Sequence, residues 1–295
     1  MHTCEPLKRY LRCTKIGNPV TIKLAQRELL LYIQKMNPLD LVNTVKHFPK
    51  NEVGSAVVGE ILKRNFSKFN SKDIAVLVPS IRLLGDTQRK EEILSAVLPV
   101  VLPLIASMRT TDMCMTLWGL TKLNIPPTDM QPILDAVLSL IAKDNCRRMQ
   151  FMNHINISQL LLTFSKYAQN TKNGEFIVFE ELLKFLNTEN FASQIKDDAM
   201  AFHIYSVANI SQAIRFPVSH PVKIQFFEKM KNEVKTRSRL SPIQLVDCIR
   251  GLARAGICDK EIVYSILLPA LESNDLKLKP EQRESIDLII KQFST

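Results

Sequence analysis

A helical segment from the middle of the chain returns, with many substitutions, near its C-terminal end. Residues 112–125 read DMCMTLWGLTKLNI, and residues 243–257 read IQLVDCIRGLARAGI. Each copy has a glycine within the expected helix, Gly119 or Gly251, followed by leucine and by a basic residue three places after the glycine. Distant copies of one helical unit are typical of repeat proteins whose helix pairs stack on one another. The sequence therefore predicts an all-α fold, a solenoid of helical hairpins in an α-α superhelix.

Polar capping residues and apolar periodicity place helix pairs along most of the chain. The first helix of each pair is expected to begin near an Asp, Asn or Ser, because these side chains accept hydrogen bonds from free N–H groups. Apolar anchors in the first helices recur at intervals of about forty residues, which predicts about six degenerate repeats. The anchors are Leu41, Ile74, Met113, Leu160, Met200, Leu245 and Ile286. The second helices are expected at residues 53–66, 91–108, 129–143, 175–186, 222–234 and 261–271.

The glycines within the repeated segment carry a prediction of their own. A glycine inside a helix costs about 1 kcal/mol relative to alanine, so its presence there needs a packing reason. We expect Gly119 and Gly251 to lie in first helices, at close contacts between helices.

The N-terminal 36 residues are unusually basic. They contain seven lysines and arginines against two glutamates, Glu5 and Glu28. Such a composition is typical of mitochondrial transit peptides, and the alternative is a solvated basic capping helix. We expect residues 1–36 to form a basic N-terminal segment and capping helix, and residues 37–295 to form a single helical-repeat domain.

Composition excludes several kinds of chemistry. The chain has 8 glycines and no glycine-rich loop of the kind that cradles a phosphate in α/β folds. The 6 cysteines and 5 histidines lack the spacing of a zinc site or of a nucleophile and its base. The longest uncharged apolar run, residues 93–108, is shorter than the roughly 20 residues of a membrane-spanning helix. We therefore expect a non-enzymatic protein without a cofactor, a metal ion or a membrane span.

The formal net charge of +10 favours an anionic partner such as RNA. Arg250 and Arg254 are four residues apart, so they share one helix face. They flank its expected buried stripe of Leu245, Ile249 and Leu252, with Val246 as an alternative member, and could project into a groove of the solenoid. Basic residues at matching repeat positions would form a ladder for phosphates, and the alternative is ordinary solvated surface charge. The candidate RNA-binding residues are Lys46, Lys50, Lys122, Arg147, Arg148, Lys229, Lys231, Arg250 and Arg254. The aromatic side chains of Trp118, Phe202 and Tyr205 are expected mainly in the core, with a partly exposed Trp118 as the alternative, because it aligns with Arg250.

The segments around the two glycines resemble the organellar octotricopeptide and heptatricopeptide repeat proteins, a group that includes the FAST-kinase-like proteins and the proteins with RAP domains. The resemblance rests on residues 118–123 and on residues 250–256 followed by DKEI, with partial copies at 206–210 and 80–85. It implies a protein of the mitochondrion, in the matrix, or of the plastid that binds RNA or belongs to a ribonucleoprotein complex. No RAP domain is recognised, so no nuclease-like role is expected.

Three functions remain open from the sequence. The first is a non-enzymatic mitochondrial RNA-binding protein or ribonucleoprotein scaffold in RNA processing, editing or stability, with single-stranded or structured organellar RNA and other proteins of the complex as partners. The second is a structural or assembly protein of a mitochondrial ribosome. The third is a HEAT-like adaptor that contacts proteins and no RNA.

Overall fold

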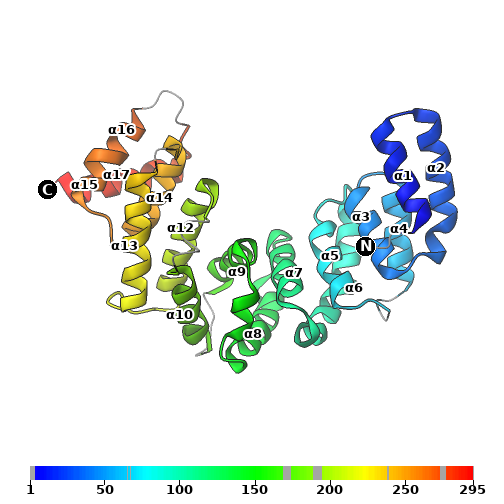
Figure 1. Cartoon of the computed structure of the whole chain (residues 1–295), viewed down its shortest axis with the longest axis horizontal. Coiled ribbons are helices and arrows are strands. Elements are labelled where there is room, and N and C mark those ends of the chain that lie inside the picture. Colours follow the sequence, from blue (N-terminus) through cyan, green and yellow to red (C-terminus); the bar gives the residue numbers. More distant parts are fainter. Residues whose placement is uncertain are drawn as a thin grey trace. The chain divides into compact units, whose positions relative to one another are not determined.

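The computed structural model describes residues 4–64, 66, 68–168, 174–188, 195–237, 239–272 and 277–294. Every regular element in these ranges is helical and no strand occurs in them, so the all-α prediction is confirmed (Figure 1). The chain divides into two compact units, unit 1 (Met1–Leu140) and unit 2 (Ile141–Thr295). The sequence predicted one boundary, before residue 37. The boundary between the two units instead lies after Leu140, within the helix Pro127–Lys143.

Unit 1 contains two rows of contacting helices. The first helices of its hairpins, α3, α5 and α7, contact one another in chain order, and the second helices α2, α4 and α6 form a parallel series of contacts. Prolines within α6 do not interrupt it. The helices are α1 (Glu5–Ile16), α2 (Pro19–Tyr32), α3 (Pro38–His47), α4 (Glu52–Lys63), α5 (Ser71–Ile81), α6 (Thr87–Leu104), α7 (Thr110–Lys122) and α8 (Pro127–Lys143), which continues into unit 2, with short 3-10 turns at Ile33–Lys35 and Ile105–Ser107.

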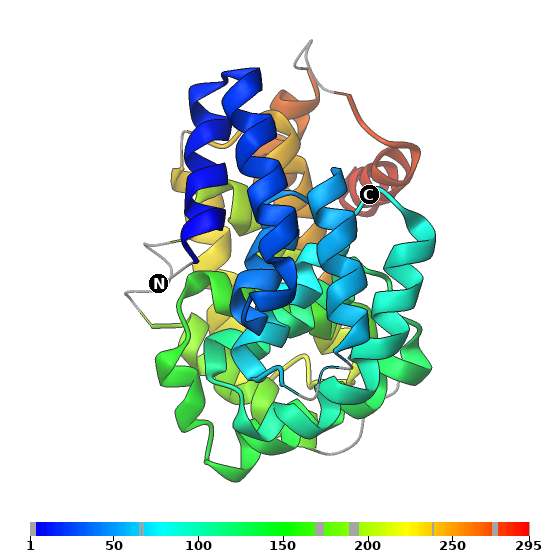
Figure 2. The same cartoon turned by 90° about the vertical axis from the view of Figure 1, so that its right-hand side faces the viewer.

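The basic N-terminal segment is part of unit 1. Figure 1 and Figure 2 both show α1 and α2 side by side as an antiparallel pair. Leu7 and Tyr10 of α1 are buried, and the Tyr10 hydroxyl accepts a hydrogen bond from the Asn51 amide at 3.3 Å. The backbone N–H of Cys4 donates to Asp40 at the start of α3. Residues 5–16 thus add a helix that the sequence did not separate from its basic segment.

Unit 2 has the same alternation of contacts. Its first helices α9, α12 and α14 contact one another in order, α17 contacts α14, and the second helices α10 and α13 contact each other. The second helix that follows α14 contains a π-helical turn at Val263–Leu267. The helices are α9 (His154–Tyr167), α10 (Gly174–Leu186), α12 (Asp197–Ala213), α13 (Pro221–Thr236), α14 (Pro242–Arg254), α15 (Lys260–Ile262), α16 (Leu268–Leu271) and α17 (Pro280–Ser294), with a 3-10 turn at Arg147–Phe151.

Several first helices begin at reciprocal capping pairs. In α5, the Asn70 side chain accepts from the backbone N–H of Asp73, and the Asp73 carboxylate accepts from the N–H of Asn70, at 3.1 and 3.0 Å. The same reciprocal pair occurs at Asn153 of α9 and at Ser241 of α14. The sequence placed the start of this helix at Asp73. Asp73 instead lies one turn inside α5, because Asn70 is the capping residue.

The two glycines of the repeated segment lie at close helix crossings, as predicted. A Cβ on Gly119 of α7 would come within 2.8 Å of the backbone nitrogen of Pro79 in α5. A Cβ on Gly251 of α14 would come within 2.6 Å of the Cγ2 methyl of Ile204 in α12. Only a residue without a side chain allows these backbones to approach so closely.

Arginine at the end of a second helix closes two of the hairpins. Arg64, after α4, pairs with Glu60 one turn earlier and donates to the carbonyl oxygen of Met36, just before α3, at 2.6 Å. Arg237, after α13, pairs with Glu233 one turn earlier and donates to the carbonyl oxygen of Ile195, just before α12, at 2.7 Å. We call each such contact an arginine latch, because it joins the end of a hairpin to the segment that precedes its own first helix.

One predicted anchor is wrong by a single residue. Six of the seven anchors are buried, but Leu245 of α14 is only half-buried, and its neighbour Val246 is fully buried instead. The buried stripe of α14 runs through Val246, Ile249 and Leu252. The stripe therefore begins one residue later than predicted, on a helix that contacts both α12 and α17.

Candidate functional site

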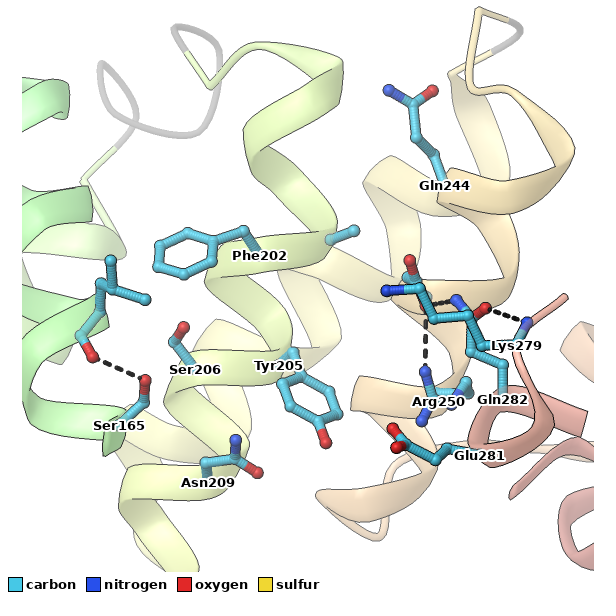
Figure 3. Close-up of a pocket in the computed structure, with 13 residues that line it drawn as sticks. Ser165, Phe202, Tyr205, Ser206, Asn209, Gln244, Arg250, Lys279, Glu281 and Gln282 are labelled. Atoms are coloured by element: carbon cyan, nitrogen blue, oxygen red, sulfur yellow. Dashed lines mark hydrogen bonds and ion pairs between the residues drawn. The ribbon is translucent and has the colours of Figure 1, made fainter. Parts of the chain in front are cut away.

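An open groove of about 530 Å³ runs across the first helices of unit 2 (Figure 3). Side chains from four helices line it, so its walls depend on the stacking of α9, α12, α14 and the start of α17. The lining is mixed: two aromatic rings, three carboxamides, two cations and two carboxylates. These are Phe202, Tyr205 and Asn209 of α12, Gln244, Asp247 and Arg250 of α14, and Lys279, Glu281 and Gln282 at the start of α17.

A second recess of about 390 Å³ adjoins this groove. The two recesses share Tyr205 and Arg250, and the second continues to Gln212 and Arg254. Tyr205 and Arg250 therefore stand at the centre of one surface that crosses α12, α14 and α17. We call this surface the unit 2 groove.

Arg254 lies on the unit 2 groove with its charge uncompensated. Its Nε donates to the Gln212 side chain at 2.9 Å, and its Nη1 donates to the Tyr205 hydroxyl at 3.1 Å. The guanidinium carbon is 5.4 Å from the centre of the Tyr205 ring. Among the described residues Arg254 forms no ion pair, and it is exposed. A guanidinium held in this way keeps a fixed orientation and remains available to an anion.

Arg250 is held more tightly and is partly neutralised. Its Nη1 pairs with Asp247 at 3.1 Å, and its Nη2 donates to the Ser285 hydroxyl at 3.3 Å. Its Nε is buried without a hydrogen-bond partner in the described part of the chain, and so is the Oδ1 of Asn209. Buried polar atoms without partners are uncommon in native structures, and each calls for an explanation.

The other candidate residues of unit 2 are less available. Lys229 donates to the carbonyl oxygens of Asn187 and Thr188, where it caps the end of α10. Lys231 pairs with Glu228 at 2.7 Å and with Asp259 at 3.4 Å. Arg148 pairs with Asp144, one turn earlier, while Arg147 is exposed. The second-helix pair Lys229 and Lys231 thus has structural roles that the sequence did not predict.

In unit 1, Lys46, Lys50 and Lys122 are all exposed. They belong to α3, to the turn after α3 and to α7, which are first-helix positions. A ladder that joins them to Arg250 and Arg254 stays a prediction. Sequence reasoning missed Arg82, directly after α5, whose guanidinium lies 4.9 Å from the centre of the Trp118 ring.

The aromatic residues expected in the core lie partly outside it. Trp118, Phe202 and Tyr205 are each half-buried, and the last two line the unit 2 groove. A signal for this was present in the sequence. Tyr205 and Asn209 are four residues apart on one helix, and aromatic and amide residues at that spacing share a face.

A buried hydrogen bond joins α9 to α12 beneath the groove. The Ser158 hydroxyl lies 2.6 Å from Nε2 of His203, and burial lowers the pKa of His203 to about 4. A serine beside a neutral histidine has the composition of a nucleophile and its base. However, His203 is only 1% exposed, so this pair lies in the core and links two helices.

The thiols and possible metal ligands offer little further chemistry. Burial raises the pKa of Cys114 and of Cys248 to about 12, so both remain protonated at neutral pH. Within the described ranges no cluster of His, Cys, Asp and Glu could hold a metal ion. No helix there is long and apolar enough to span a bilayer. No family model, curated protein or solved structure was found to match this chain.

Proposed function

We propose that this protein is a non-enzymatic RNA-binding protein of the mitochondrial matrix, and that the unit 2 groove contacts the RNA. Its fold is a degenerate solenoid of helical hairpins, and it serves as a scaffold in RNA processing, editing or stability. Support for the repeat comes from the two glycine crossings, the shared capping pairs and the two arginine latches, which recur at matching positions of different hairpins.

The observation that carries the RNA proposal is the arrangement of Arg254 and Tyr205. An uncompensated guanidinium is held beside an aromatic ring on an open groove. Phosphates bind arginine through charge-assisted hydrogen bonds, and bases stack on aromatic rings. A cation for the phosphate and an aromatic ring for the base together suit one nucleotide of a single strand. Here the cation, Arg254, and the ring, Tyr205, lie in contact.

Binding of labelled single-stranded RNA, followed by fluorescence anisotropy at several salt concentrations, tests the proposal. Arg254→Ala is expected to weaken binding of different sequences alike, because a phosphate contact carries no sequence information. The slope of log K against log salt is expected to become shallower by about 0.7 for each phosphate that the variant no longer neutralises. Arg250→Ala is less informative, since it also leaves Asp247 without its partner.

The matched control is a double substitution of Lys229 and Lys231 with alanine on α13. These lysines cap α10 and pair with carboxylates, so their replacement is expected to leave RNA binding nearly unchanged. If the control abolishes binding and Arg254→Ala does not, the second-helix face is the RNA site. If the purified protein binds no RNA at moderate salt, the proposal fails.

A second candidate function has its own support in unit 1. Val20, Leu24 and Leu31 of α2 are 67%, 57% and 85% exposed. Exposed apolar side chains along one helix favour contact with another protein. This feature fits a structural or assembly protein of a mitochondrial ribosome, or an adaptor that binds proteins alone. Purification from mitochondria with and without ribonuclease separates the two cases, because a protein scaffold keeps its partners after the RNA is digested.

The mitochondrial location follows from the family resemblance and from the basic residues of α1 and α2. Import of the labelled chain into isolated mitochondria is the test, with protection from external protease as the sign of the matrix. Failure of import would remove the organellar proposal and leave RNA binding to be judged on its own measurement.

A further inference from the structure

Helix α2 has apolar side chains on two opposite faces. Ala25 and Leu29 are buried on one face, where α2 contacts α1 and α4. Val20, Leu24 and Leu31 lie on the other face and are exposed. Figure 1 shows α2 at the edge of unit 1, where no helix of the described chain covers that second face. A surface helix ordinarily has a single apolar face, so the second one is available to a partner.

The exposed face of α2 has the spacing of a coiled-coil seam. Four of its side chains follow one another at steps of four, three and four residues: Val20, Leu24, Arg27 and Leu31. Alternating steps of three and four residues place side chains in a narrow line that a second helix can cover. This line is about 16 Å long, or three helical turns. A helix that lies in a bilayer surface has a broader apolar face.

The cations of this face have no carboxylate of their own. Lys23 and Arg27 of α2, and Lys35 in the turn after it, are exposed, and none of them forms an ion pair with another described residue. The one carboxylate of α2, Glu28, pairs with Arg9 of α1 at 2.8 Å. Charges at and beside a helix seam determine which partner is accepted, so this face favours a helix that carries carboxylates.

We propose that the exposed face of α2 binds one helix of an acidic partner protein. The partner helix presents aliphatic side chains to Val20, Leu24 and Leu31, and its carboxylates pair with Lys23 and Arg27. The inference names the chemistry of the partner that the second candidate function requires, and it rests on that function. It is independent of RNA binding at the unit 2 groove, since all of these residues belong to unit 1.

Charge and shape disfavour other occupants of this face. A second copy of the chain would bring two faces of the same positive charge together, and like charges across an interface are repulsive. RNA offers phosphates to the cations but no aliphatic surface to the leucines, which would stay in contact with water. An acidic amphipathic helix satisfies both the apolar and the charged members of the face.

The test uses the full chain and a labelled synthetic helix of three heptads, followed by fluorescence anisotropy. The peptide has leucine at positions a and d and glutamate at e and g, so that its own copies repel one another. The unsubstituted protein is expected to bind it about tenfold more tightly than a peptide with lysine in place of glutamate. Leu24→Glu is expected to weaken binding of the acidic peptide by about tenfold or more, since Leu24 lies within the line.

A charge reversal separates this site from general attraction to a basic protein. Lys23→Glu together with Arg27→Glu is expected to weaken the acidic peptide and to strengthen the lysine peptide, so that the preference inverts. Leu102→Glu on α6 is the matched control, because Leu102 is another exposed aliphatic side chain of unit 1, and it is expected to leave both affinities nearly unchanged. Thermal unfolding checks that each variant is folded.

Absence of acidic-peptide binding overturns the inference, whatever else the protein binds. Sedimentation with phosphatidylglycerol vesicles would then assign the face to a membrane, and dimerisation that Leu24→Glu abolishes would assign it to a second copy. Binding that Leu24→Glu leaves unchanged also overturns the inference, because the peptide then lies elsewhere. Partners that copurify after ribonuclease treatment, without acidic-peptide binding, would keep the second candidate function and remove only this site. RNA binding and its dependence on Arg254 are measured separately and stand or fall on their own.

Discussion

Two helix crossings, α5 with α7 in unit 1 and α12 with α14 in unit 2, are packed in the same way. The arginine and the aromatic ring beside each crossing, however, have exchanged helices. Each brings two first helices together over a glycine, Gly119 or Gly251. Each also places an arginine against an aromatic ring. In unit 1 the arginine is on the earlier helix and the ring on the later one, whereas in unit 2 the ring is earlier and the arginines are later.

The difference teaches which part of a repeat is constrained. The backbone distance at the crossing fixes glycine, because no larger residue fits there. The residue before the glycine is free to be Trp118 or Arg250, as long as its partner across the crossing is complementary. Packing is thus shared between the units, while the chemistry of the exposed face differs.

Acid is expected to produce the largest difference between the two units. Burial lowers the pKa of His203 to about 4 from an ordinary 6.5. Below pH 6.5 the unfolded chain takes up a proton that the folded chain refuses, so stability falls as pH decreases towards 4, by about 3 kcal/mol. In unit 1 the contributions oppose each other: burial lowers the pKa of His47, as it does that of His203, but burial raises the pKa of Asp73, so that acid favours the folded form there.

Trp118, the only tryptophan, reports on unit 1, and far-ultraviolet circular dichroism reports on all helices. Acid titration in moderate urea should show loss of helix before the tryptophan signal changes. His203→Gln keeps a hydrogen-bonding partner for Ser158 without a group that titrates, and should abolish the early transition. Coincident transitions of the two signals in the unsubstituted protein would contradict this prediction.

Alanine substitution at the crossings tests whether the packing is shared. Gly119→Ala and Gly251→Ala are each expected to cost about 1–3 kcal/mol, because the new methyl group meets atoms closer than 3.0 Å. The cost should be larger for Gly119, where the nearest atom is backbone nitrogen, than for Gly251, where it is a side-chain methyl.

Gly59 of α4 is the control, because a Cβ there meets nothing within 4 Å. Gly59→Ala is expected to stabilise the protein by up to about 1 kcal/mol through helix propensity alone. Urea unfolding of the three variants gives the free energies. A neutral effect of both crossing substitutions would show that the helices can separate at little cost.

Helix capping sharpens the comparison further, since each crossing has one capped and one uncapped helix. α5 and α14 begin with reciprocal capping pairs, while α7 and α12 begin at Arg109 and Lys196 without a side-chain cap. Arg109→Asn is expected to stabilise unit 1 by about 0.5–1 kcal/mol. The same gain from Lys196→Asn, measured by thermal unfolding, is expected in unit 2, and no gain in either would mean that other groups already satisfy these helix starts.

The arginine contacts give the smallest expected effect. A double-mutant cycle of Arg82→Ala and Trp118→Leu should give a coupling of about 0.5–1 kcal/mol, typical of a cation over an aromatic ring at an exposed site. The corresponding cycle of Arg254→Ala and Tyr205→Leu removes a hydrogen bond as well as the ring and should give a larger value. Equal couplings would show that this hydrogen bond adds nothing at the surface.

The sequence predicted the helices and the glycine crossings well because both depend on local rules. Proline, asparagine and periodic apolar residues mark helix boundaries, and an interior glycine indicates a close contact. The availability of charged side chains could not be predicted in this way. Lys231 meets Asp259 only because the folded chain brings the start of α15 beside α13.

The walls of the groove could not be predicted for the same reason, although Arg250 and Arg254 were expected to project into a groove. Its wall includes Gln282 of α17, which lies far along the chain from Asn209 and Tyr205. Arg250 was expected to be free for phosphates or for solvent, whereas it contacts Asp247, Ser285 and the Tyr205 ring. Only the stacked helices bring these side chains into one surface.

The arginine latches bear on how such a chain can evolve. Because Arg64 and Arg237 tie the end of a hairpin to the residues just before it, the two ends of that module meet at one place. A duplication or deletion of the whole module therefore joins neighbours that are already adjacent, and no new linker has to span a gap. A gene that encodes such modules can gain or lose one without changing the contacts that close the remaining modules.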